Sequence, residues 1–148
     1  MAYHVDLSYN SFSGSIPHSW KNLKKLKVMK LWSNRLSGEV QDHLSKWKRL
    51  QIMDLGENEF SGTIPMIMSQ NIEVVILRAN RFEGTIQPQL FNLSYLFHLD
   101  LAHNKLSGSL PHYVYNLTQM VTFHVNSWHQ AMIFIATLLN QLVTFGCK

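Results

Sequence analysis

Residues 96–111 read LFHLDLAHNKLSGSLP, and this arrangement of leucine-like residues, asparagine and glycine returns four more times along the chain. The recurring asparagines are 24, 24, 22 and 24 residues apart, and each is followed four positions later by a glycine. These asparagines are Asn10, Asn34, Asn58, Asn80 and Asn104. A period of this length indicates a chain built from stacked copies of one structural unit.

Two apolar residues stand five and three positions before each asparagine, as Leu99 and Leu101 do before Asn104. Residues two apart point to the same side of a β-strand, so we expect a short strand that buries both. One unit alone cannot cover this apolar row, and neighbouring units must therefore stack. A buried turn leaves backbone groups without partners, and an asparagine amide can satisfy them because it both donates and accepts hydrogen bonds. We interpret the five asparagines as structural.

The spacing L-x-x-L-x-L-x-x-N-x-L is the leucine-rich-repeat signature. The segments SGSIP at 13–17 and SGTIP at 61–65, with variants in the other repeats, resemble the plant-specific class of these repeats. That class occurs in the ectodomains of receptor-like proteins and receptor-like kinases and in polygalacturonase-inhibiting proteins. The resemblance covers about residues 2–125. It implies an α/β solenoid, a horseshoe whose short parallel strands line the concave face.

The pattern predicts a repeat array over residues 1–126, with five repeats and a degenerate sixth strand. Residues 127–148 fit a C-terminal helix and tail instead. Ser127 and Gln130 form a capping-box pair, and Gly146 is placed to stop the helix. We expect an amphipathic helix that caps the open end of the array.

The alternative for residues 131–145 is a membrane segment. This apolar run is about 15 residues long and contains Asn140 and Gln141, whereas a helix needs about 20 residues to cross a bilayer. The length favours the cap. We therefore expect membrane association only through this C-terminal segment or through segments that the chain lacks.

Composition points to one domain with a continuous core, because 46% of the 148 residues are hydrophobic and 15% are charged. The formal net charge is +4, and nine of the thirteen lysines and arginines fall between Lys21 and Arg49. These basic residues are not interleaved with a series of stacking aromatic residues, which argues against a nucleic-acid partner. We interpret them as a solvated face.

The chain lacks two features that the resemblance implies. Its one cysteine, Cys147, excludes an internal disulfide, whereas relatives carry paired cysteines in caps at both ends. Met1 is followed at once by a repeat strand, without a secretory leader. We therefore expect an incomplete copy of a longer receptor-type protein. By resemblance, its location is the extracellular face of the plasma membrane or the apoplast.

Two sequons, at Asn92 and Asn116, permit N-glycosylation if the chain enters the secretory pathway. Both precede strands, where glycans of the family commonly lie. The alternative is that N-L-S and N-L-T simply follow the repeat consensus.

Catalytic chemistry has no support in the sequence. There is no glycine-rich phosphate loop, no nucleophile elbow, no zinc-protease motif and no kinase signature, so we expect no enzyme activity, no cofactor and no metal. Among eight histidines, His98, His103 and His124 could gather near Asp100 on the last two strands. Such a cluster could respond to pH near 6. The alternative is that they are ordinary surface histidines.

Recognition in this architecture belongs to the concave sheet, where seven residues are our candidate ligand-binding set. Most of them are large or charged at positions where a small residue would suffice. They are Lys30, Trp32, Glu57, Arg78, His98, Asp100 and His103. Tryptophan and arginine are favoured at binding hot spots, so Trp32 and Arg78 lead the set. A wide sheet offers a track for a peptide or protein ligand, and a co-receptor ectodomain is a further possible partner.

These observations favour a non-catalytic recognition module that resembles the ligand-sensing ectodomain of a plant receptor-like protein in defence or developmental signalling. One alternative is an inhibitor resembling the polygalacturonase-inhibiting proteins. The other is a degenerate receptor gene fragment without function of its own.

Overall fold

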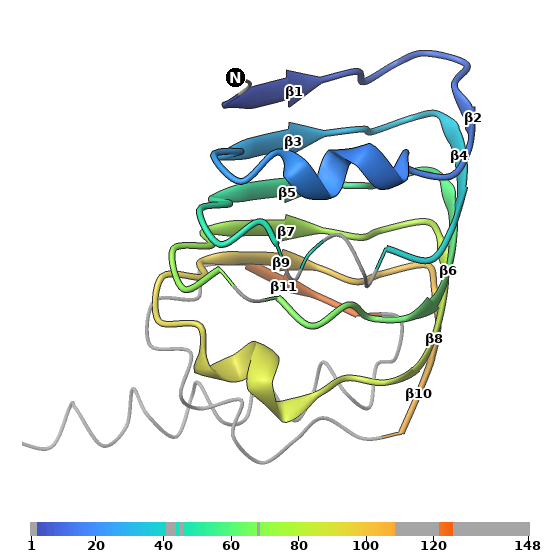
Figure 1. The fold of residues 1–148 in the computed structure, drawn as a ribbon. Helices are drawn as coiled ribbons and strands as arrows, with labels where there is room; N and C mark the ends of the chain where they lie inside the picture. The colour runs from blue at the N-terminus through green and yellow to red at the C-terminus, as the bar shows by residue number, and fades with distance from the viewer. Residues whose placement is uncertain (1–2, 41–43, 45, 68, 109–121, 126–148) are drawn as a thin grey trace, which may run out of the picture.

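The computed structural model describes residues 3–40, 44, 46–67, 69–108 and 122–125. Within these ranges the chain winds into five stacked coils that each contribute a strand to a first sheet and then a strand to a second, and a sixth strand of the first sheet follows them (Figure 1). The predicted parallel-strand solenoid is confirmed.

The first sheet has six parallel strands. They are β1 (His4–Asp6), β3 (Val28–Lys30), β5 (Ile52–Asp54), β7 (Val74–Ile76), β9 (His98–Asp100) and β11 (Thr122–His124), in that order across the sheet. Their middle residues are in register from strand to strand and point into the core, where Met29, Met53, Val75 and Leu99 are fully buried. The leucines two positions later, such as Leu101, are buried as well. The predicted alternation is therefore present.

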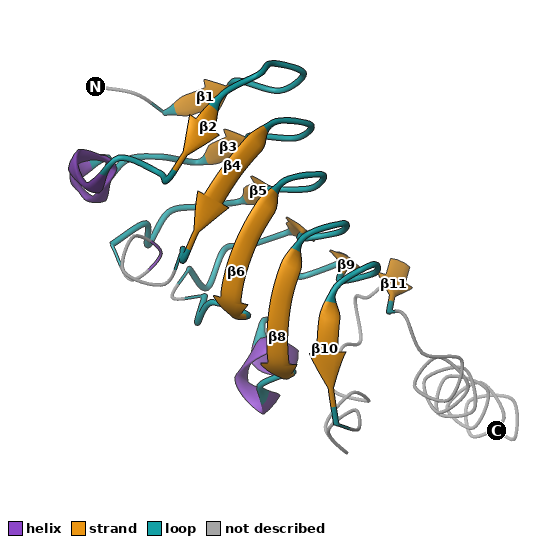
Figure 2. Ribbon diagram, turned by 90° about the vertical axis from the view of Figure 1, so that its right-hand side faces the viewer, coloured by secondary structure: helices purple, strands orange, loops and turns teal. Residues whose placement is uncertain are grey.

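A second parallel sheet follows the turn after each asparagine (Figure 2). Its strands are β2 (Ser13–Gly14), β4 (Arg35–Gly38), β6 (Glu59–Thr63), β8 (Arg81–Thr85) and β10 (Lys105–Ser107). The repeat pattern does not predict these strands, because most of them contain a glycine, which is depleted in β-strands. The glycines have φ between +78° and +83°, a conformation that glycine adopts without steric cost.

The return segments close each coil on the side opposite the first sheet. Two of them contain a 3-10 helix, η1 (His18–Asn22) and η2 (Pro88–Asn92). Large apolar side chains fill the space between the sheets and these segments, and Phe60 and Phe82 stack from coil to coil with ring centroids 6.5 Å apart. The core is therefore one continuous column along the solenoid.

The repeated asparagines connect neighbouring coils at the turn after the first sheet. The Asn58 side-chain amide donates to the backbone carbonyls of Leu31 (2.9 Å), Leu55 (3.2 Å) and Gly56 (2.9 Å), and its Oδ1 accepts from the backbone N–H of Leu36 (3.0 Å). Asn34, Asn80 and Asn104 make equivalent bonds. Each inner coil thus satisfies backbone groups of the coil before it.

The C-terminal predictions lie outside the described residues. These are the capping helix within residues 127–148 and its alternative, the membrane segment at 131–145. Within the described ranges, no helix is long and apolar enough to span a bilayer. The division at residue 126 stays a prediction.

Candidate recognition surface

Strand register places one column of side chains across the face of the first sheet that points away from the core. We call this the outer sheet face. The column contains the last residue of each strand: Asp6, Lys30, Asp54, Ile76, Asp100 and His124. Five of its six members are charged or titratable, whereas the middle residues of the same strands form the apolar core. Charged and titratable side chains of these strands are therefore concentrated on the outer sheet face.

The outer sheet face is hollowed near its N-terminal end. The hollow has a volume of about 440 Å³, and it is lined by Asp6, Ser8, Tyr9, Lys30, Trp32 and Asp54. We call it the Trp32 hollow. Two of our candidate residues, Lys30 and Trp32, lie in its wall. The candidate set lacks the other four. Asp6 and Asp54 share the column of Lys30, and Ser8 has the same repeat position as Trp32, which was the available signal for these three.

Trp32 lies close to the next coil because Gly56 has no side chain. A Cβ atom on Gly56 would lie 2.6 Å from the Trp32 ring, so the indole packs directly against the backbone of the next coil. The ring remains half-buried, and the rest of its surface lines the hollow. Nothing in the repeat pattern indicates that Gly56 makes this close approach possible.

Each aspartate of the column accepts a local hydrogen bond of the same kind. Asp6, Asp54 and Asp100 each accept from the backbone N–H two residues later, at 3.1, 3.1 and 3.0 Å. Burial raises the pKa of Asp54, although the Gly56 N–H and the charge of Lys30 act in the opposite direction. Hydrogen bonds from Ser8 lower the pKa of Asp6, which is fully exposed.

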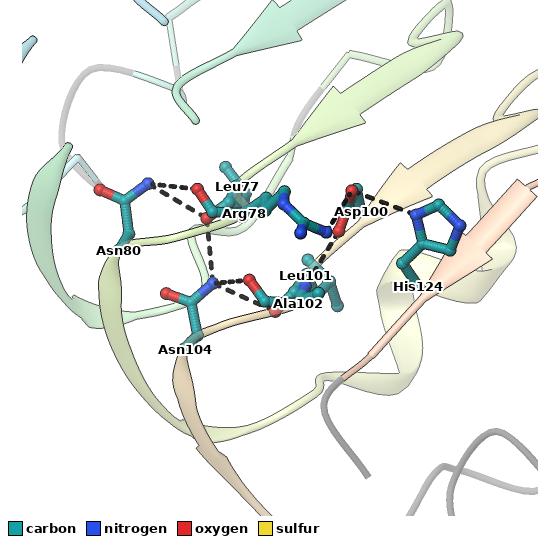
Figure 3. A network of polar contacts seen from close by, with 8 residues as sticks. All are labelled: Leu77, Arg78, Asn80, Asp100, Leu101, Ala102, Asn104 and His124. Carbon is teal, nitrogen blue, oxygen red and sulfur yellow. Dashed lines mark hydrogen bonds and ion pairs between the residues drawn. The ribbon is translucent and has the colours of Figure 1, made fainter. Parts of the chain in front are cut away.

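A polar cluster lies at the other end of the outer sheet face (Figure 3). The buried carboxylate of Asp100 directs Oδ2 toward Arg78, at 3.6 Å, and toward Nδ1 of His124, at 3.1 Å. The His98 ring meets the His124 ring edge-on with centroids 6.3 Å apart. The sequence analysis predicted three histidines near Asp100; the structure places His98 and His124 there and adds Arg78, whereas His103 lies in the turn after β9.

The remaining two candidates lie at the margin of this face. Glu57 and His103 each precede a repeat asparagine and have φ of +49° and +56°. Both side chains are exposed in the turns after β5 and β9. The candidate set therefore divides into the Trp32 hollow, the Asp100 cluster and the turn edge.

Away from this face, a smaller cavity of about 160 Å³ lies in the first two coils, beside Ile16, Pro17 and Trp20. In the ranges that the structure describes, no group of three or more His, Cys, Asp or Glu side chains could hold a metal ion. A cavity on the return side, near Ile64 and Leu93, has a volume of about 30 Å³, which suits one water molecule.

Comparison with known proteins agrees with this architecture. A family model described as Leucine Rich Repeat matches residues 3–23 and 95–117. No curated protein sequence matches the chain.

Among solved structures, the plant peptide hormone receptor RGFR1 in complex with RGF2 is similar with a TM-score of 0.79 and 34% identity, over 84% of this chain and 20% of the receptor chain. The ectodomain of the Arabidopsis receptor kinase HAESA, in complex with an extended IDA peptide hormone, has a TM-score of 0.78 and 32% identity over 82% and 21%. The BIR3–SERK2 complex from Arabidopsis thaliana is similar with a TM-score of 0.72 and 29% identity, over 83% of this chain and 69% of the matched chain. The chain thus spans about a fifth of the length of the first two receptor chains.

Proposed function

Because the chain is a leucine-rich-repeat array similar to the ectodomains of plant receptor kinases, we propose that it is a non-catalytic recognition module. Its ligand is a peptide or a partner protein that lies along the outer sheet face. The observation that carries this proposal is the placement of the Trp32 hollow and the Asp100 cluster on one face of one sheet. The similar receptors RGFR1 and HAESA were each solved with a peptide hormone.

The dimensions of the face suit an extended ligand. Three strand-to-strand steps separate β3, next to the hollow, from β9, which carries Asp100. At about 4.8 Å per step, the two groups are about 14 Å apart, a distance that four or five residues of extended peptide cover. A single ligand can therefore contact both groups, which favours a peptide track over a small-molecule pocket.

A partner ectodomain is the second element of this proposal. The match to the BIR3–SERK2 complex supports a partner of that kind. By the same resemblance, we place the site of action at the outside of the plasma membrane or in the apoplast, in defence or developmental signalling.

Binding of synthetic peptides to the chain tests the proposal. We expect a peptide panel to contain ligands whose dissociation constants rise about tenfold or more in Trp32→Ala and in Arg78→Ala, because tryptophan and arginine anchors dominate such interfaces. Calorimetry measures these constants. Arg81→Ala is the matched control: Arg81 is an exposed arginine paired with Glu59 on the second sheet, at 2.8 Å. Unchanged affinity of every ligand in both hot-spot variants would assign binding to another face.

A further inference from the structure

The repeat places chemically identical aspartates in two different surroundings. Asp54 and Asp100 occupy the same position of their coils, and each uses one oxygen, Oδ1, to accept the backbone N–H two residues later. At Asp100 the other oxygen faces two nitrogen groups: the guanidinium of Arg78 from the preceding coil and the imidazole of His124 from the following coil. Asp100 thus shows what this position binds when its neighbours supply a cation.

The equivalent neighbours of Asp54 are apolar. Trp32 takes the place of Arg78, and Ile76 takes the place of His124. In the part of the chain that the structure describes, Asp54 makes no ion pair within 4 Å, and its register neighbour Lys30 makes none either. The second carboxylate oxygen of Asp54 therefore has room for a cation that the chain does not provide.

The Trp32 hollow has the charge and the surfaces to receive that cation. Its two carboxylates and one ammonium give a net charge of −1 when all three are ionised, from the aspartates Asp6 and Asp54 and from Lys30. The indole of Trp32 provides an aromatic surface beside the carboxylate of Asp54. Guanidinium groups combine bidentate pairing to carboxylates with stacking on aromatic rings, which the compact ammonium of lysine does not.

We propose that the Trp32 hollow binds an arginine side chain of the peptide ligand, with its guanidinium paired to Asp54 and lying against the Trp32 ring. This inference rests on the proposed function, since it names the residue of the ligand that the outer sheet face selects. A bound guanidinium repeats at Asp54 the contact that Arg78 already makes with Asp100. The positive charge of the guanidinium also stabilises the ionised carboxylate of Asp54, which burial disfavours and whose pKa it raises.

A pair of short peptides tests this directly. The probes are acetyl-Gly-Arg-Gly-amide and the same peptide with citrulline, which keeps the shape of arginine and removes its charge. We expect the arginine peptide to shift the NMR signals of the Gly56 amide and the Trp32 indole N–H in a saturable way. The citrulline peptide should bind about tenfold more weakly or not at all, as expected for the loss of a charge-assisted hydrogen bond. Equal shifts from both peptides would overturn the inference.

Three variants assign the effect to the hollow. Asp54→Asn should weaken binding of the arginine peptide about tenfold, whereas Glu59→Gln, which removes the charge of an exposed carboxylate on the second sheet, should leave its affinity unchanged. Trp32→Arg should place a guanidinium beside Asp54 as Arg78 stands beside Asp100, and thereby abolish binding of the probe. Wild-type affinity in Asp54→Asn would overturn the inference.

The outcome is separable from that of the proposed function. Longer peptides could lose affinity in Trp32→Ala and Arg78→Ala while the arginine and citrulline probes bind equally. That result would support binding on the outer sheet face and overturn the selection of arginine by the Trp32 hollow. Alternatively, the arginine probe could bind more tightly than the citrulline probe while the longer peptides bind independently of Arg78. That result would support arginine binding in the Trp32 hollow and overturn the extended ligand that reaches the Asp100 cluster.

Discussion

The five asparagines do not contribute equally, although they occupy one repeat position. The side chain of Asn58 is buried and bonds to its own coil and the coil before it, whereas the side chain of Asn10 is exposed and, among the described residues, donates only to Leu7 and Ser8 of its own coil. We expect Asn58→Ala to lower the free energy of unfolding by about 2–4 kcal/mol, because it leaves buried carbonyls without donors. Water can replace the exposed bonds of Asn10, so Asn10→Ala should cost about 0.5–1 kcal/mol.

Urea denaturation followed by circular dichroism measures both values. Folded spectra of the two variants at zero denaturant provide the control that the solenoid still forms. Equal losses at the two positions would contradict a role for these amides in joining coils.

Asp54 predicts a pH dependence of stability with a definite sign. Its pKa in the folded chain is raised above the ordinary value of 3.8, so the folded state favours the protonated carboxyl. The stability that depends on this proton is present below pH 3.8 and is lost as the pH rises through the folded-state pKa. Asp54→Asn keeps an acceptor for the Gly56 N–H and removes the ionisation, so the variant should be more stable than the wild type at pH 7.

The gain should shrink as the pH falls through the folded-state pKa of Asp54 and should be absent below pH 3.8. Denaturant midpoints of both proteins at pH 7 and at pH 3.5 check this. A stability difference that does not change with pH would show that the effect does not come from the Asp54 charge. Should the variant be more stable and yet bind the arginine peptide poorly, the charge at Asp54 is kept for recognition at the expense of stability.

Among the elements, the first sheet was predictable and the second was not. Period-two alternation around positions such as Met53 and Leu55 specifies a strand with one buried side, and the structure places both residues in the core. The segments of the second sheet, such as β6, carry glycine and serine and show no such alternation. Their strands form because neighbouring coils hold them in parallel register, which is a property of the stack and is absent from any single segment.

The candidate site was also predictable only in part, because single side chains can be recognised in the sequence whereas contacts between coils cannot. Trp32 and Arg78 stand out in the sequence because they are large side chains at outward positions. The hollow beside Trp32 depends on the close approach of Gly56 from the next coil, and the carboxylate of Asp100 contacts residues of two other coils. Contacts between coils follow from repeat register, so they can be anticipated only once the register is known.

At the scale of the whole molecule, glycosylation tests whether the Asn92 sequon is used when the chain enters the secretory pathway. Asn92 ends η2 with an exposed side chain, and Asn116 lies outside the described residues. Expressed with a secretory leader, the chain should carry a glycan at Asn92, seen as a mass loss on glycosidase treatment. Asn92→Gln should remove that part of the mass shift and leave any contribution of Asn116. Secreted protein without modification at Asn92 would show that its sequon only follows the repeat consensus.

The ladder of amide bonds between coils also limits how this chain can change in length. The interval from Asn58 to Asn80 is two residues shorter than the others, yet Asn80 still accepts the N–H of Phe60 at 2.9 Å, so the return path absorbs small deletions. Gain or loss of an entire turn of the solenoid would preserve every ladder, while a few residues added within a strand would misalign all of them. Duplication of whole turns is therefore the tolerated route to growth, and each one widens the recognition track by about 4.8 Å.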